Sequence, residues 1–123
     1  MAKRTKTIAK QLVKFALRKK AEDIVLLDLR KITSMTDYFI VCTGASDVQV
    51  KAIADAITDG CKKDKLDVYH VEGYHAARWV LIDLVDIVVH VFHPEVRQYY
   101  QLERLWGDAI QETFSEESED TQN

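Results

Sequence analysis

The chain has 123 residues, of which 47% are hydrophobic and 30% charged, an ordinary balance for one folded domain. No apolar run reaches the roughly 20 residues that a membrane helix needs. Residues 1–10 lack the apolar core of a secretory signal, so we expect a cytoplasmic protein without a membrane contact. The net charge of −3 comes from the acidic end, residues 115–123, which holds Glu116, Glu117, Glu119 and Asp120. The rest is close to neutral, which argues against DNA as a partner.

The first predicted element is an amphipathic helix over residues 5–20. Its apolar side chains follow the helical spacing i, i+4, i+7 and i+8, at Ile8, Leu12, Phe15 and Ala16. Lysine and arginine residues occupy the other side, which is typical of a solvent-exposed face; contact with RNA is the alternative interpretation. No aromatic residue stands between the lysines, so the stacking platform of a single-strand binder is not indicated.

Strand, strand, helix and strand follow, over residues 24–29, 37–43, 46–63 and 66–71. The helix has the clearest start signal. Ser46 is a typical N-cap residue, and Gln49 three residues later completes a capping box.

The most apolar stretch, residues 72–93, predicts a hairpin whose arms are residues 79–82 and 87–92. Side chains alternate along a strand, so Trp79, Leu81 and Asp83 share one face of the first arm. Both faces of both arms are largely apolar. Either the helices of the chain cover both faces, or one face stays apolar for a partner that docks on Trp79 and Leu81.

Pro94 predicts the start of a last helix, whose apolar residues continue at helical spacing to Ile110. Residues 115–123 contain no apolar residue and predict a disordered acidic tail, so the folded domain is expected to span residues 1–114. The order of elements predicts a single α/β (α+β) domain with a mixed five-stranded sheet flanked by helices.

The strongest catalytic candidate is Gly44-Ala45-Ser46, because the amides at a helix N-terminus can bind phosphate and nucleotidyltransferases carry a Gly-Ser element in such a place. That chemistry also needs carboxylates that converge on divalent metal ions. Asp55 and Asp59 are interpreted as surface charges, and Asp83 and Asp86 flank the hairpin turn, where acidic residues normally serve turn geometry. A metal-dependent nucleotidyltransferase that uses Asp83 and Asp86 is the alternative function.

The histidines and cysteines do not predict a metal site. His90 and His93 are three residues apart, so in a strand they would point to opposite faces. Cys42 and Cys61 lack metal-binding spacing and indicate buried thiols. No nucleophile elbow, phosphate-binding P-loop or dinucleotide fingerprint occurs, so we expect no cofactor and no enzymatic activity.

Several segments together resemble the ribosomal silencing factor S family, also called the Iojap family, over residues 8–110. The matching pieces are residues 36–41, 44–46 with Gln49, 52–57, 72–73, 79–83, 86–92 and the pattern from Arg97 to Ala109. The resemblance implies a nucleotidyltransferase-like fold that lacks the catalytic carboxylates, and therefore a protein that is not an enzyme.

The resemblance further implies that the protein binds the large ribosomal subunit through the large-subunit protein fourteen, on the face that meets the small subunit. Such a protein blocks subunit joining sterically and represses translation when nutrients are scarce. Family members often form homodimers, and neighbouring rRNA is a further candidate contact. An apolar centre with an acidic rim would complement a basic ribosomal protein.

The contact surface of the family maps to Trp79, Leu81 and Asp83, with further candidates at Asp86, His90, Tyr100, Leu102, Glu103 and Trp106. Two positions depart from the family pattern. Val85 stands where the family usually has glycine, so a turn that needs a positive φ would strain it. Gly107 interrupts the last predicted helix, at a cost of roughly 1 kcal/mol relative to alanine.

Overall fold

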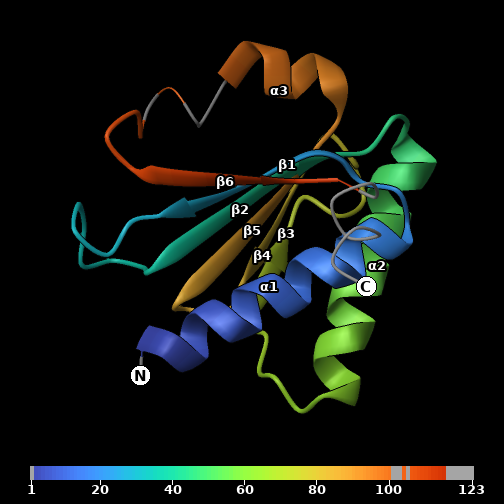
Figure 1. The fold of residues 1–123 in the computed structure, drawn as a ribbon. Helices are drawn as coiled ribbons and strands as arrows, with labels where there is room; N and C mark the ends of the chain where they lie inside the picture. Colours follow the sequence, from blue (N-terminus) through green and yellow to red (C-terminus); the bar gives the residue numbers. More distant parts are fainter. Residues whose placement is uncertain (1, 101–103, 105, 116–123) are drawn as a thin grey trace.

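The structure is a computed structural model, and it describes residues 2–100, 104 and 106–115. In chain order its elements are helix α1 (Ala2–Arg18), strands β1 (Glu22–Asp28) and β2 (Tyr38–Thr43), helix α2 (Asp47–Lys63), strands β3 (His70–Glu72), β4 (Trp79–Asp83) and β5 (Ile87–Phe92), helix α3 (Pro94–Tyr100) and strand β6 (Ile110–Phe114). Figure 1 shows α1 and α2 on one face of a twisted sheet and α3 on the other. The predicted mixed α+β fold is therefore confirmed.

The sheet has six strands in the order β3-β4-β5-β2-β1-β6. The central pair, β2 and β5, runs parallel, and the other neighbours are antiparallel. A parallel pair needs a long crossover connection, which the segment from α2 to β4 supplies. The hairpin of β4 and β5 pairs the residues of one face directly: Trp79 with Phe92, Leu81 with His90, and Asp83 with Val88.

The larger hydrophobic core lies between the sheet and the two long helices. Helix α2 buries Val50, Ile53, Ala54, Ile57 and Cys61 on one side. The hairpin contributes Val80, Ile82, Val89 and Val91, all of them 0% exposed. Alternation along β4 and β5 thus sends every second side chain into this core. Among the described helices, none is long and apolar enough to cross a membrane.

Gln49 ties the start of α2 to the end of α1. Ser46 caps α2, since its hydroxyl accepts a hydrogen bond from the Gln49 backbone N–H at 3.2 Å. The Gln49 side-chain carbonyl accepts from the Ala45 N–H at 2.7 Å, one residue before the usual capping-box partner. Its amide group donates to the carbonyls of Lys19 and Lys20, which the end of a helix leaves without intrahelical partners.

The C-terminal segment differs from the prediction of one helix that continues to Ile110. Helix α3 is described over Pro94–Tyr100 and residue 104 is also helical, but residues 106–109 form turns and β6 pairs antiparallel with β1. Gly107 disfavours a helix at this point, and pairing with β6 covers an edge of β1 that would otherwise be bare. The sheet therefore has six strands where five were predicted. The third strand is also shorter than predicted, His70–Glu72 in place of residues 66–71.

The second face of the sheet is covered only in part. A smaller core forms there from Val25, Leu27, Leu29, Val41, Phe92 and Ala109. Helix α3 packs on this face through Val96, whereas α1 and α2, of 17 residues each, cover the other face. Among the described residues, part of the second face stays open as a hollow.

The turn between β4 and β5 holds Val85 at a φ of +73°. This left-handed conformation is unfavourable for a β-branched residue and costs of order 1–3 kcal/mol. The turn is fixed by hydrogen bonds from the Val85 N–H to Asp83 Oδ1 at 2.7 Å and from the Leu84 N–H to the Ile87 carbonyl at 2.8 Å. The strain that the sequence predicted at Val85 is therefore present.

Replacing Val85 by asparagine should stabilise the protein. Asparagine tolerates the left-handed region, and the Val85 side chain is 56% exposed, so little buried surface is lost. We expect the free energy of unfolding in urea to rise by about 1 kcal/mol. Val85→Gly should stabilise less, because glycine has more freedom to lose on folding. A Val85→Asn protein that unfolds at lower urea than the parent would contradict the strained turn.

Candidate functional site: a groove on the open sheet face

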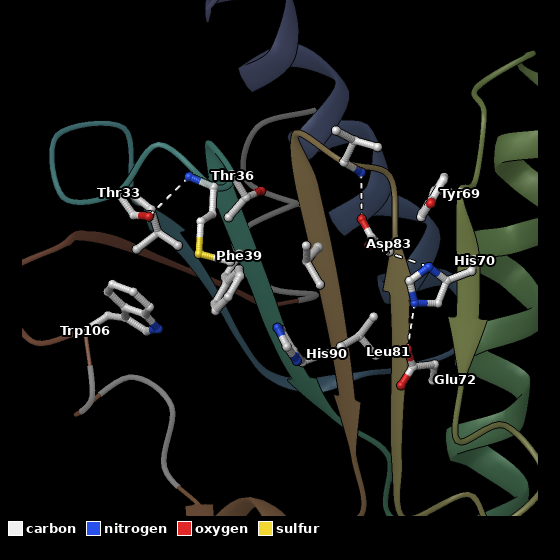
Figure 2. Close-up of a pocket in the computed structure, with 14 residues that line it drawn as sticks. Thr33, Thr36, Phe39, Tyr69, His70, Glu72, Leu81, Asp83, His90 and Trp106 are labelled. Carbon is white, nitrogen blue, oxygen red and sulfur yellow. Dashed lines mark hydrogen bonds and ion pairs between the residues drawn. The ribbon is translucent and has the colours of Figure 1, made fainter.

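A groove of about 610 Å³ crosses the open face of the sheet. Apolar and aromatic side chains from several elements form its floor: Leu29, Phe39, Leu81, Val88 and Trp106. In Figure 2, Trp106 lies at one end and His70 and Glu72 lie at the other, with Phe39, His90 and Leu81 between them. The groove thus extends from the segment before β6, across β2 and β5, to β4 and β3.

Three large apolar side chains at the rim of the groove are exposed to solvent. Met35 is 87% exposed, Tyr69 is 72% exposed and Val85 is 56% exposed, and each comes from a different loop. Scattered apolar residues on a surface are ordinary, but several of them around an apolar hollow are typical of a binding site.

His90 is buried in the floor of the groove, where it is only 4% exposed. The indole N–H of Trp79 donates to Nδ1 of His90 at 3.1 Å. Phe39 packs against the imidazole edge to face, with 4.6 Å between the ring centroids. Burial lowers the pKa of His90 to about 4, because the charged form is poorly solvated there. The imidazole is therefore neutral at pH 7.

The end of the groove near β3 is acidic. Nε2 of His70 lies 2.7 Å from a carboxylate oxygen of Glu72, and its Nδ1 lies 3.7 Å from Oδ2 of Asp83. Two carboxylates thus flank one imidazole, as the dashed lines in Figure 2 show. This end of the groove suits a partner that carries positive charge.

The structure brings together four of the nine site residues that the sequence predicted: Leu81, Asp83, His90 and Trp106 line the groove. Trp79 lies beside the groove on the same face. It is half-buried and packs against Phe92 with 4.9 Å between the ring centroids. Its role in the geometry is to hold His90.

Of the remaining predicted site residues, only Asp86 has a described side chain. Asp86 is exposed in the hairpin turn and does not line the groove. The side chain of Tyr100 and the whole of Leu102 and Glu103 lie outside the described residues, as does most of the predicted acidic tail.

The sequence did not indicate several residues that line the groove, above all Met35, Phe39 and Tyr69. Strand alternation could have indicated Phe39. Its neighbours Tyr38 and Ile40 both face the larger core, so Phe39 must point to the opposite face of the sheet, where the groove lies. Met35 is a lone apolar residue in a polar connection, and nothing local distinguishes it from an ordinary loop residue.

Of the two aspartates of the alternative nucleotidyltransferase function, Asp83 stabilises the hairpin turn with its carboxylate, and Asp86 takes part through its backbone. Asp83 accepts the Val85 N–H, and the Asp86 backbone carbonyl accepts the N–H groups of Asp37 and Tyr38 at 2.9 and 3.1 Å. Over residues 2–100, 104 and 106–115, no three histidine, cysteine or acidic side chains are arranged to hold a metal ion. No observed contact favours the transfer reaction.

Comparison with known proteins identifies the family. The family described as ribosomal silencing factor during starvation matches residues 2–123. The ribosomal silencing factor RsfS of Bacillus subtilis is 54% identical over 91 residues, which cover 74% of this chain and 77% of that protein. A crystal structure of a Chromobacterium violaceum protein is similar with a TM-score of 0.81 at 41% identity, covering 83% of this chain and 85% of that one. The chain belongs to the ribosomal silencing factor family.

A more distant relative comes from Mus musculus and is named mitochondrial assembly of ribosomal large subunit protein 1. It is 32% identical over 98 residues, which cover 77% of this chain and 43% of that protein. Its name refers to the large ribosomal subunit.

The buried neutral His90 should make the fold sensitive to acid. Its pKa is about 4 in the folded protein against 6.5 for a free histidine, so between these values the unfolded chain binds more protons. The contribution of His90 is therefore fully present above about pH 6.5 and is lost as the pH falls towards 4. At about 1.4 kcal/mol per pKa unit, we expect a loss of about 3 kcal/mol by pH 4.

Urea denaturation at a series of pH values measures this loss. Glutamine does not titrate, so His90→Gln should flatten the stability profile between pH 6.5 and 4. Equal slopes for the two proteins in this range would show that other groups cause the acid sensitivity.

Proposed function

We propose that this chain binds the large ribosomal subunit through the groove, blocks joining of the small subunit, and so represses translation in the cytoplasm when nutrients are scarce. The proposed partner is the large-subunit protein fourteen on the intersubunit face. The observation that carries the proposal is an apolar groove left open in a chain of the ribosomal silencing factor family. The name of the Mus musculus relative supports the choice of the large subunit.

The chemistry of the groove fits a protein partner with some positive charge. Met35 and Tyr69 present exposed apolar surface that association would bury. Glu72 and Asp83 at one end, and the exposed Asp86 in the nearby turn, attract a basic ribosomal protein and repel the phosphates of bare rRNA.

The proposed action is occlusion, so no chemical step is needed. A folded domain that occupies the intersubunit face excludes the small subunit from the same space. A variant that binds the large subunit more weakly through the groove should therefore inhibit subunit joining more weakly to the same extent. No catalytic rate should change separately.

The basic side of α1 lies away from the groove. Lys10, Lys14 and Arg18 are exposed on a helix that covers the opposite face of the sheet (Figure 1). A chain docked through the groove therefore turns these side chains away from the protein beneath it. A contact with neighbouring rRNA through α1 is then secondary. The homodimer that the family resemblance implies stays a prediction, which analytical ultracentrifugation of the purified chain tests.

Shortening the rim residues should abolish ribosome binding without harming the fold. Met35→Ser combined with Tyr69→Ala removes two side chains that are 87% and 72% exposed, so the melting temperature should stay within a few degrees. We expect the affinity for Bacillus subtilis large subunits, measured by co-sedimentation, to fall by about tenfold or more. The block of subunit joining, followed by light scattering, should weaken in parallel.

Two controls accompany this variant. Val48→Ser removes an apolar side chain that is 78% exposed on α2, outside the groove, and should leave binding unchanged. Lys10→Glu with Lys14→Glu tests the α1 interpretation: a loss of binding here, together with normal binding by the rim variant, would assign the contact to RNA and overturn the proposal.

A further inference from the structure

Two polar atoms that belong to the lining of the groove lack a hydrogen-bond partner. They are Nε2 of His90 and Oγ1 of Thr36, and both are fully buried in residues that are 4% and 8% exposed. Neither atom meets a donor or acceptor among the described residues. A buried polar group without a partner is costly, by about 1–3 kcal/mol, so such groups need an explanation.

The hydrogen bond from Trp79 fixes which nitrogen of His90 carries the proton. An indole N–H can only donate, so Nδ1 of His90 must present its lone pair at 3.1 Å. A neutral imidazole has one N–H, which must then be on Nε2. Nε2 is therefore a donor, held in a fixed ring orientation without an acceptor.

One side chain that lines the groove, Phe39, packs directly on the ring that carries this donor. Phe39 packs edge to face on the imidazole, is half-exposed, and lines the groove above the buried ring. Figure 2 shows Phe39 beside His90 on the groove floor. Rotation of the Phe39 ring is a small change of the kind that side chains commonly make when a partner binds.

The charge around the groove selects the kind of acceptor. Glu72 and Asp83 make one end of the groove acidic, so a carboxylate brought to His90 would be repelled. A carbonyl oxygen is a strong acceptor without net charge. The unpaired hydroxyl of Thr36 could donate to an oxygen of the same kind.

We propose that the partner segment in the groove places a carbonyl oxygen on Nε2–H of His90, which makes His90 a residue that selects the partner rather than only part of the core. This inference rests on the proposed function, since the segment belongs to the protein that the groove binds. It adds a directional contact to a surface that otherwise recognises shape and charge.

Two substitutions of His90 separate this role from a structural one. The side-chain oxygen of asparagine takes the place of Nδ1, so His90→Asn keeps an acceptor for Trp79 and removes the donor. The amide nitrogen of glutamine takes the place of Nε2, so His90→Gln keeps the donor and removes that acceptor. Co-sedimentation with Bacillus subtilis large subunits should show a loss of affinity of about tenfold for His90→Asn and a markedly smaller loss for His90→Gln.

The possible outcomes distinguish the two proposals. If the parent chain fails to bind large subunits, both the proposed function and this inference fall. The parent could bind while His90→Asn binds equally well, or while His90→Gln loses as much affinity as His90→Asn. In either case the role proposed for Nε2 is wrong, and the proposed function stands.

NMR of the unaltered chain gives a test that does not depend on the variants folding. With ¹⁵N-labelled histidine, the Nε2–H proton of His90 should shift downfield and exchange more slowly when isolated large-subunit protein fourteen is added. An Nε2–H signal that keeps its position while the rim residues shift would overturn the inference.

Discussion

The architecture depends on a mismatch between a sheet with two apolar faces and helices that cover one face fully and the other only in part. On the covered face, α1 and α2 exclude water from Val80, Ile82, Val89 and Val91 completely. On the other face, α3 and the segment around Trp106 protect Phe92 and Leu27 but leave the groove open. When a partner covers apolar area that the fold leaves in water, removing that area from water favours binding by about 25 cal/mol per Å². The groove follows from how this chain distributes its helices.

Local patterns in the sequence were sufficient for much of this fold. The periodicity of α1 and α2, the cap at Ser46 and the alternation along β4 and β5 are short-range signals, and the structure contains each of them. β6 was missed because its residues continue a helical spacing, and only pairing with the distant β1 turns them into a strand. For the same reason, only some of the residues that line the groove could be predicted from the sequence. Leu81 and His90 lie in a recognisable hairpin, whereas Met35, Phe39 and Tyr69 join them only through tertiary structure.

Several features that cost stability gather at this one surface. Val85 is strained at the rim, Nε2 of His90 is buried without an acceptor, and Met35 and Tyr69 expose apolar area. Such features also occur away from the groove: Lys20, Asp23, Lys65 and Ala77 have positive φ values, and the Tyr38 hydroxyl is buried without a hydrogen-bond partner. The features at the groove differ from the others in that a bound partner could relieve two of them, by covering Met35 and Tyr69 and by supplying an acceptor to Nε2 of His90.

A cryo-electron microscopy map of the chain on the Bacillus subtilis large subunit would show which face of the sheet makes the contact. We expect the face with Phe39, Leu81 and His90 to be buried against the large-subunit protein fourteen, while α1 and α2 point towards the space of the small subunit. A map in which α1 and α2 form the contact, and the groove faces solvent, would contradict it.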